Sequence, residues 1–184
     1  YNHATAYLTA GMFEAHNCAD FELSAFSFGR PPMDEMGRRL NAAFDQFYDV
    51  ATESDHDIAA LARDLGVDIA VDVKGLTFES RPGIFAHRAA PIQASWLAYP
   101  GTMGLASMDY LIADPVLIPE EHRAFYTEKI AYLPPSYQVN DSKRAAPART
   151  TTRAALGLPL KAFVFASFNN TWKLTPAVFD IWMR

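Results

Sequence analysis

The sequence has little cysteine, no surplus of positive charge and no long hydrophobic run. Its single cysteine, Cys18, cannot form an internal disulfide, which favours a reducing compartment, and we expect the cytoplasm. Lys and Arg total 16 against 21 Asp and Glu, for a net charge of -5, so nucleic acid is not an expected partner. A membrane-spanning helix needs about 20 apolar residues. No run approaches that length, so we expect no membrane partner.

Signature motifs of two large nucleotide-binding classes are also missing. Neither GxGxxG nor GxxxxGK[ST] occurs, which disfavours NAD-type and P-loop proteins. The histidines are dispersed along the sequence and only one cysteine is present, so we predict no metal site. The 184 residues, 50% hydrophobic and 20% charged, fit one globular domain or one domain and the start of another. Because the first residue is not methionine and the last lies in an apparent helix, we expect both ends to be internal to a longer protein.

Helix and strand signals alternate along the sequence. The most complete helix signature lies between Ser54 and Gly66, where a capping box with Asp57 precedes an apolar stripe and a C-cap glycine follows it. Other helices are predicted over 5–15, from Pro31 and Pro32 to about Phe44, and from Thr175 with Pro176 at its first position. Strands are predicted over 21–28, 46–50, 67–73, 92–97, 110–113, 129–133 and 162–168. This alternation predicts an α/β fold with a Rossmann-like, mostly parallel sheet covered by helices on both faces.

Four loops lie after predicted strands or before predicted helices, where parallel α/β sheets bind ligands. They read WLAYPGTMG at 96–104, SFNNTWKLTP at 167–176, NHAT at 2–5 and KGLTFESR at 74–81. Pro100 suits a turn that brings backbone amides close to a ligand, Lys173 near a helix start suits a diphosphate, and His3 could transfer a proton. Each loop is at least as typical of an ordinary turn or surface loop, so local chemistry leaves the choice open.

Longer segments resemble one enzyme family. The string RPGIFAHRAAPIQASWLAYPGTMGLASMDYLIAD at 81–114 resembles the catalytic region of the O-linked N-acetylglucosamine transferase family, glycosyltransferase family 41. In the same order, NHATAYL at 2–8 resembles the family's NHPTSHL and YTEKIAYLP at 126–134 resembles YSEKLAYMP. LGLP at 156–159 and FASFNNTWKLTP at 165–176 resemble its GLP and FNxxYK segments.

The resemblance implies an inverting glycosyltransferase with two Rossmann-like lobes, the GT-B arrangement. Such an enzyme takes UDP-N-acetylglucosamine as co-substrate and needs no metal or other cofactor. Residues 1–135 would form the N-terminal lobe, 136–152 a connector, and 153–184 the start of the C-terminal nucleotide-sugar-binding lobe. The resemblance implies catalytic roles for His3 and Lys173, and substrate binding by Thr5, Leu97, Ala98, Pro100, Asn170 and Lys173.

The implied function is transfer of N-acetylglucosamine to Ser or Thr hydroxyls of proteins. Its partners would be a UDP-sugar donor and a protein acceptor, with tetratricopeptide repeats upstream, and the fragment alone should not turn over. The sequence departs from the family pattern at Ala4, Leu76, Phe78 and Ala98, which bears on donor and acceptor choice. The alternatives are therefore a transferase that uses UDP-glucose or modifies asparagine, and a non-catalytic nucleotide-sugar or protein-binding module.

Overall fold

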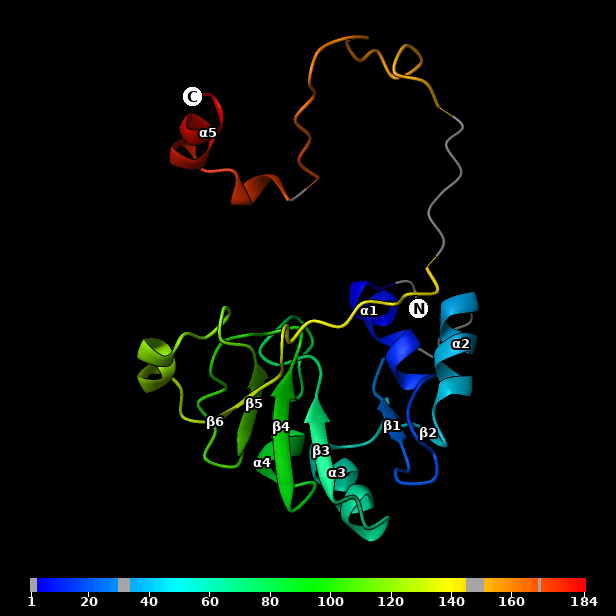
Figure 1. Cartoon of the computed structure of the whole chain (residues 1–184). Coiled ribbons are helices and arrows are strands. Elements are labelled where there is room, and N and C mark those ends of the chain that lie inside the picture. Colours follow the sequence, from blue (N-terminus) through cyan, green and yellow to red (C-terminus); the bar gives the residue numbers. More distant parts are fainter. Residues whose placement is uncertain (1–2, 30–33, 145–150, 169) are drawn as a thin grey trace. The chain divides into compact units, whose positions relative to one another are not determined.

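The computed structural model describes residues 3–29, 34–144, 151–168 and 170–184. The chain forms two compact units, Tyr1–Arg144 and Ala145–Arg184. The helices of the first unit are α1 (Ala4–Phe13), α2 (Glu35–Ala43), α3 (Asp55–Asp64), α4 (Gly83–Ala86) and the 3-10 helix η1 (Glu120–Phe125) (Figure 1). Its strands are β1 (Ser24–Ser27), β2 (Gln46–Asp49), β3 (Ile69–Asp72), β4 (Ile92–Trp96), β5 (Tyr110–Ala113) and β6 (Lys129–Tyr132). The described part of the second unit contains η2 (Thr171–Lys173) and α5 (Pro176–Trp182).

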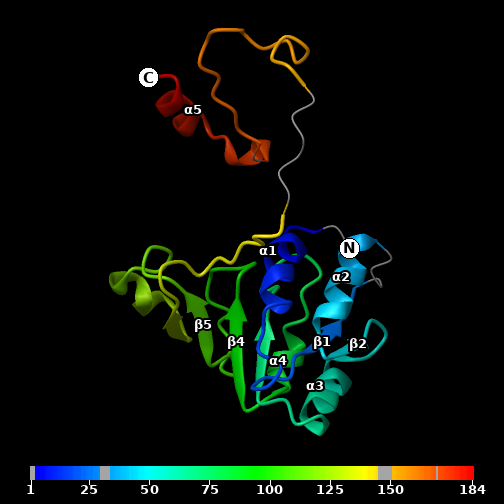
Figure 2. The ribbon, with the colours of Figure 1, turned by 45° about the vertical axis from the view of Figure 1, so that its right-hand side comes forward.

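Every strand pair is parallel, which confirms the predicted α/β class. β1 and β2 form a two-stranded sheet, and the four-stranded sheet has the order β3-β4-β5-β6. The two sheets lie side by side with β1 next to β3 in both ribbon views (Figures 1 and 2). Parallel strands end at one edge of their sheet, so the loops after β3, β4 and β5 gather there.

Helices pack on both faces of the β1–β2 sheet. On one face, α3 and α4 bury the main core, which also takes in Phe26 and Tyr48 from the strands. On the other face, Phe47 contacts Phe44 at the end of α2, which in turn contacts Phe13 of α1 at a centroid distance of 4.6 Å. The main core consists of Val50, Ile58, Ala59, Ala62, Ile84, Phe85, Ala89, Met103 and Met108.

The predicted cover of both faces is incomplete on the four-stranded sheet. The side chains of Ile69, Val71 and Ile92 share one face through the β3–β4 register and are 56%, 43% and 41% exposed. No element among the described residues buries them. The opposite face is buried, because Ser95 and Leu111 are each 1% exposed.

Capping chemistry explains why α3 matches its prediction. The Ser54 hydroxyl accepts the Asp57 backbone N–H at 3.1 Å and donates to the Asp57 carboxylate at 2.7 Å. After the helix, Gly66 adopts a φ of +72°, which suits glycine at a C-cap. The predicted start of α2 at Pro31 and Pro32 lies outside the described residues, and the described helix begins at Glu35 with Asp34 as its N-cap.

The predicted strand over 162–168 is wrong. These residues form no strand, and Phe163, Phe165 and Phe168 are 81%, 89% and 98% exposed. A parallel strand needs a neighbour for its backbone hydrogen bonds, and the described part of the second unit contains no other strand. The apolar pattern therefore has no sheet to join. By contrast, α5 begins at Pro176 with Thr175 as its N-cap, as predicted.

The segment after β6 crosses the edge where the strands end. The indole Nε1 of Trp96 donates to the Tyr137 carbonyl at 3.0 Å, and the Asp114 carboxylate accepts the Tyr137 N–H at 2.8 Å. Farther along, the Asp141 carboxylate accepts from the Arg39 guanidinium on α2 at 2.6 Å. The first part of the expected connector, up to Arg144, is thus tied to β4, β5 and α2 within the first unit.

Candidate functional site

A strained turn ends the buried strand β4. Leu97 has a φ of +79°, a left-handed value that is rare for a branched side chain. The Ala98 N–H donates to the Trp96 carbonyl at 3.2 Å, so Leu97 is the centre of a γ-turn of the rare positive-φ type. Its side chain is 8% exposed and keeps the turn in place, while Ala98 and Pro100 are exposed. Backbone strain of this kind gathers at binding and catalytic loops.

Tyr99 joins this turn to the loop after β3. A Cβ added at Gly75 would lie 2.4 Å from the Cβ of Tyr99, and one added at Gly101 would lie 2.8 Å from its hydroxyl. Gly75 also has a φ of +58°, and its N–H donates to the buried Asp72 carboxylate at 3.0 Å. Only glycine permits this close approach of the two loops. The loops 74–81 and 96–104, predicted separately, therefore form one surface.

A buried carboxylate fixes the far side of the turn. Glu128, 5% exposed, accepts the Met103 N–H at 2.7 Å and the Thr102 hydroxyl at 2.7 Å. The Tyr126 hydroxyl donates to the Pro100 carbonyl at 3.2 Å. Burial and, next, the negative charge of Glu128 raise the pKa of Tyr126, so the hydroxyl stays protonated and keeps this hydrogen bond.

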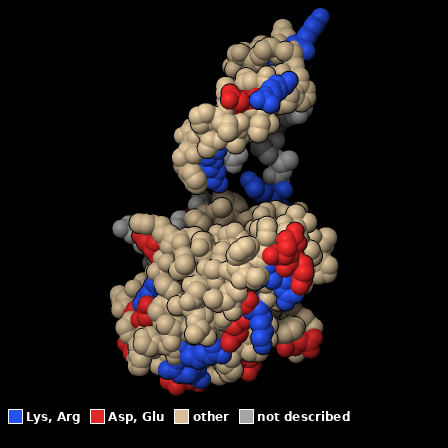
Figure 3. All heavy atoms as spheres, turned by 90° about the vertical axis from the view of Figure 1, so that its left-hand side faces the viewer, with Lys and Arg blue, Asp and Glu red and all other residues tan. Residues whose placement is uncertain are grey.

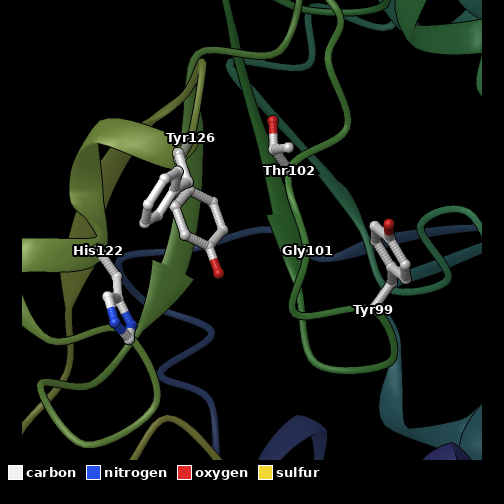
Figure 4. A pocket seen from close by; sticks show the side chains of 6 residues that line it. Tyr99, Gly101, Thr102, His122 and Tyr126 are labelled. Carbon is white, nitrogen blue, oxygen red and sulfur yellow. The ribbon is translucent and has the colours of Figure 1, made fainter.

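Thr102 and Tyr126 help to line an open pocket of about 340 Å³, a volume within the range of small-ligand sites. Its lining residues are Tyr99, Gly101, Thr102, His122, Phe125 and Tyr126. Figure 4 shows Tyr126 and His122 facing Gly101 and Thr102 from one side, with Tyr99 on the other side of the loop. The pocket thus presents two phenol rings and an imidazole, which suits a ligand with both apolar and hydroxyl surfaces.

His3 caps α1 rather than standing alone before it. Its Nδ1 accepts the Thr5 backbone N–H at 3.2 Å, and α1 begins at the next residue, Ala4. The start of α1 lies toward the edge where β3 and β4 end in both ribbon views (Figures 1 and 2). The start of α1 and the Leu97 turn therefore lie at the same edge of the first unit.

The remaining predicted residues lie together in the second unit. Asn170 is the N-cap of η2, which ends at Lys173. The Lys173 ammonium stands 5.4 Å from the centroid of the exposed Trp172 ring, a cation–π contact that leaves the ammonium in solvent. An exposed lysine beside an exposed aromatic ring can meet an anionic ligand that carries a planar group.

Sequence reasoning missed the roles of three residues in the first-unit site: Tyr126, Glu128 and Thr102, of which only Thr102 lay within a loop that it singled out. Their contacts join residues 25 or 26 positions apart, for which no local pattern exists. The YPGT turn, which ends in Thr102, was the one available signal, because a turn of Pro and Gly needs side chains elsewhere to fix it.

Charge distribution and helix length limit the partners. Figure 3 shows acidic and basic side chains interspersed over one face of the molecule, without a continuous basic patch on that face. Proteins that bind a nucleic-acid backbone concentrate Lys and Arg instead. Among the described residues, no helix combines the length and apolar character needed to span a bilayer.

Comparisons with known proteins agree on one family. The family model described as "Glycosyl transferase family 41" matches residues 1–150. An Arabidopsis thaliana protein named "Probable UDP-N-acetylglucosamine--peptide N-acetylglucosaminyltransferase SEC" is 32% identical over 186 residues, covering 98% of this chain and 19% of that protein. An Oryza sativa subsp. japonica protein named "Probable UDP-N-acetylglucosamine--peptide N-acetylglucosaminyltransferase SPINDLY" is 36% identical over 128 residues, covering 69% of this chain and 13% of that protein.

A solved structure, of a Thermobaculum terrenum O-GlcNAc transferase mutant, has the same fold. It matches with a TM-score of 0.72 and 34% identity, over 75% of this chain and 26% of that chain. The chain spans about a fifth of the length of the SEC relative, 19%. Because the family model covers most of the chain and the fold agrees, the chain belongs to glycosyl transferase family 41, and its parallel α/β unit is a lobe of the GT-B type.

Proposed function

We propose that this chain is part of an inverting glycosyltransferase that moves N-acetylglucosamine from UDP-N-acetylglucosamine to Ser or Thr hydroxyls of proteins. The names of the SEC and SPINDLY relatives, which describe UDP-N-acetylglucosamine-dependent transfer to peptides, support donor and acceptor. The first unit would be the N-terminal lobe, and the second unit the start of the nucleotide-sugar-binding lobe. Tetratricopeptide repeats upstream and a cytoplasmic location, which the single cysteine favours, belong to the same proposal.

The observation that carries this proposal is the strained Leu97 turn. In it, the chain keeps a left-handed leucine at the end of a buried strand and exposes the next residue, Ala98, followed by Pro100. A pre-formed, rigid turn can bind a sugar ring without paying to order the loop. We assign Leu97, Ala98 and Pro100 to the wall of the sugar pocket, in line with their match to the family pattern.

Transfer with inversion is a direct displacement at the anomeric carbon of the sugar. The acceptor hydroxyl oxygen forms a bond to that carbon from one face while the bond to the UDP oxygen breaks on the other. UDP leaves with the electron pair, and the hydroxyl proton passes to a nearby base or water. The protein therefore has two tasks, to stabilise the growing negative charge on the diphosphate and to orient the acceptor.

We assign the first task to Lys173, with Asn170 near the nucleotide. A fixed ammonium stabilises the leaving diphosphate most in the transition state, when its charge grows. Full positive charge at this point removes the need for a metal ion, so we propose a reaction without metal or other cofactor. The ring of Trp172 beside the ammonium restricts its side chain and so favours this placement.

We assign the second task to His3, with Thr5 beside it. Because the Nδ1 of His3 accepts a backbone N–H from Thr5, the neutral imidazole carries its proton on Nε2. In this arrangement Nε2 of His3 donates a hydrogen bond to a substrate oxygen and orients it. To act as a base, Nδ1 would have to give up the Thr5 N–H and turn toward the substrate. The geometry thus favours positioning over general-base catalysis.

Transfer of radiolabelled sugar by the full-length gene product tests the proposal. We expect label from UDP-N-acetylglucosamine on Ser or Thr of a peptide acceptor, with little from UDP-glucose and none on asparagine peptides. Lys173→Ala should lower kcat at least about 100-fold, whereas Lys161→Ala, an exposed lysine in the same unit, should leave it unchanged. UDP binding without any transfer would favour a binding module and contradict the proposed reaction.

His3 is tested by comparing His3→Ala with His3→Asn, which can accept the Thr5 N–H and still donate. If His3 positions substrate by donation, His3→Asn should keep much more activity than His3→Ala and the rate should keep its dependence on pH. If His3 is a general base, both variants should lose activity equally, and the acidic limb of the pH profile, the fall in rate as the base is protonated, should disappear.

A further inference from the structure

His16, Cys18 and Asp45 form a compact cluster of three groups that bind metals. Their ligand atoms all lie within 4.8 Å of one another. The Nε2 of His16 lies 3.1 Å from an Asp45 carboxylate oxygen and 3.4 Å from the Cys18 sulfur. Cys18 is exposed, and the side chains of His16 and Asp45 are 14% and 33% exposed.

Hydrogen bonds outside the cluster orient two of these groups. The Nδ1 of His16 lies 2.6 Å from the Phe13 carbonyl oxygen, and since a carbonyl can only accept, Nδ1 carries a proton. Metal-binding histidines in proteins are commonly fixed in this way, with the other ring nitrogen donating to a backbone carbonyl. The Leu23 N–H, donating to the Asp45 carboxylate at 2.7 Å, fixes the second group.

This arrangement leaves a lone pair of neutral His16 directed at a carboxylate. Two acceptors 3.1 Å apart repel each other unless a positive group lies between them. That group is either a proton on Nε2 or a cation bound by both side chains. The nearby sulfur of Cys18 adds a ligand that prefers zinc and other borderline-soft ions to Mg²⁺ or Ca²⁺.

We propose that His16, Cys18 and Asp45 bind one divalent transition-metal ion, with Zn²⁺ as the favoured species. Tetrahedral zinc with ordinary bond lengths places nitrogen about 3.5 Å from sulfur and about 3.4 Å from oxygen. The separations of 3.4 Å and 3.1 Å from the His16 nitrogen lie close to these values. The sulfur of Cys18 and the carboxylate of Asp45 lie within 4.8 Å of each other, against about 3.6 Å in a zinc tetrahedron, so the exposed Cys18 side chain would move toward the ion. Water would complete the fourth position.

The cluster lies away from the proposed active site. His16 and Cys18 precede β1 and Asp45 directly precedes β2, so the cluster sits where these strands begin, whereas the Leu97 turn follows the end of β4. A bound ion would join the end of α1 to the α2–β2 turn and stabilise the packing of these helices. It serves structure or regulation and takes no part in sugar transfer.

Binding is tested on the full chain after treatment with a chelator. We expect one Zn²⁺ per chain by titration calorimetry, thiolate-to-metal charge-transfer absorption with Co²⁺, and protection of Cys18 from alkylation when Zn²⁺ is bound. Cys18→Ser, His16→Gln and Asp45→Asn should each weaken binding at least about tenfold. His122→Gln, which removes an exposed histidine from η1, should bind like the unchanged chain.

Cys18→Ser is the safest variant, because the residue is exposed and the change is nearly isosteric. Circular dichroism of the variant serves as the check that it folds. Equal Zn²⁺ affinity in Cys18→Ser and the unchanged chain would overturn the proposal, as would Co²⁺ binding without the charge-transfer band. Equal alkylation of Cys18 with and without Zn²⁺ would also overturn the proposal. The cluster would then be a hydrogen-bonded group in which His16 shares a proton with its neighbours.

Discussion

Arg39 joins three segments that are far apart in the sequence. Its Nε and Nη2 donate to Glu14 at 2.6 and 2.9 Å, and its Nη1 donates to Asp141 at 2.6 Å. The Asp141 side chain is 2% exposed, while those of Arg39 and Glu14 are 25% and 21% exposed. Gly11 leaves room for this contact, because a Cβ there would lie 2.5 Å from an Asp141 carboxylate oxygen.

We predict that Arg39→Met destabilises the first unit by about 2 to 3 kcal/mol at neutral pH. A hydrogen bond to a charged group contributes about 1.5 to 3 kcal/mol, but partial exposure weakens each of these bonds. Glu14 also keeps Lys143, whose Nζ lies 2.6 Å from its carboxylate. Most of the loss therefore comes from Asp141, whose buried charge would lack its guanidinium partner.

The effect should depend on pH with a definite sign. Hydrogen bonds from Arg39 and then Lys143 lower the pKa of Glu14 from 4.5 to about 2. A lowered folded-state pKa adds stability that is fully present above pH 4.5 and is lost as the pH falls toward 2. Arg39→Met removes the larger cause of that shift, so its deficit should shrink by about 1 kcal/mol between pH 7 and pH 3.

Urea unfolding followed by circular dichroism at both pH values measures this. Arg123→Met is the matched control, because Arg123 pairs with Glu120 on the surface at 2.9 Å with side chains 45% and 77% exposed, and should cost at most about 1 kcal/mol. The reasoning is refuted if Arg39→Met is as stable as Arg123→Met at pH 7, or if its deficit grows at pH 3.

Two further substitutions test packing near the proposed site. Gly75→Ala should cost at least about 2 kcal/mol, since its φ is +58° and the new Cβ would meet Tyr99. Gly66→Ala is the control, because Gly66 has a similar φ of +72° but an added Cβ would meet nothing within 4 Å among the described residues. If both variants lowered the melting temperature equally, the contact with Tyr99 would not explain the loss in Gly75→Ala. Gln93→Leu should cost about 2 to 5 kcal/mol in urea unfolding, because a fully buried amide that makes three hydrogen bonds is lost. Gln46→Leu, on an exposed position of β2, should stay within about 0.5 kcal/mol, and equal losses would refute the burial argument.

Local chemistry predicted the elements that depend on neighbours in the sequence. The capping box at Ser54 and Asp57 and the C-cap at Gly66 fixed α3, because those contacts span three residues or fewer. Strands with many β-branched or apolar residues, such as β4, were also found. The resemblance to the transferase family then directed attention to Leu97, which local patterns marked only as the end of a strand.

Features that depend on tertiary contacts were not predictable. The left-handed φ of Leu97 contradicts the preference of its side chain and exists because the surrounding core buries it. The predicted strand over 162–168 failed for the opposite reason, since no neighbouring strand is present among the described residues of the second unit. The proximity of Asp45 to His16, 29 positions away, was not visible in the sequence either, and the prediction of no metal site remains a prediction.

The backbone of Tyr137 connects the proposed sugar pocket to the segment that follows β6. Its carbonyl accepts from Trp96, the residue directly before the strained Leu97, and its N–H donates to Asp114 at the end of β5. Both backbone polar groups of Tyr137 are therefore fixed by residues at the ends of the strands that form the site. Because packed and hydrogen-bonded groups shift together rather than bend independently, a displacement of this segment would be felt first at Trp96 and then at the Leu97 turn.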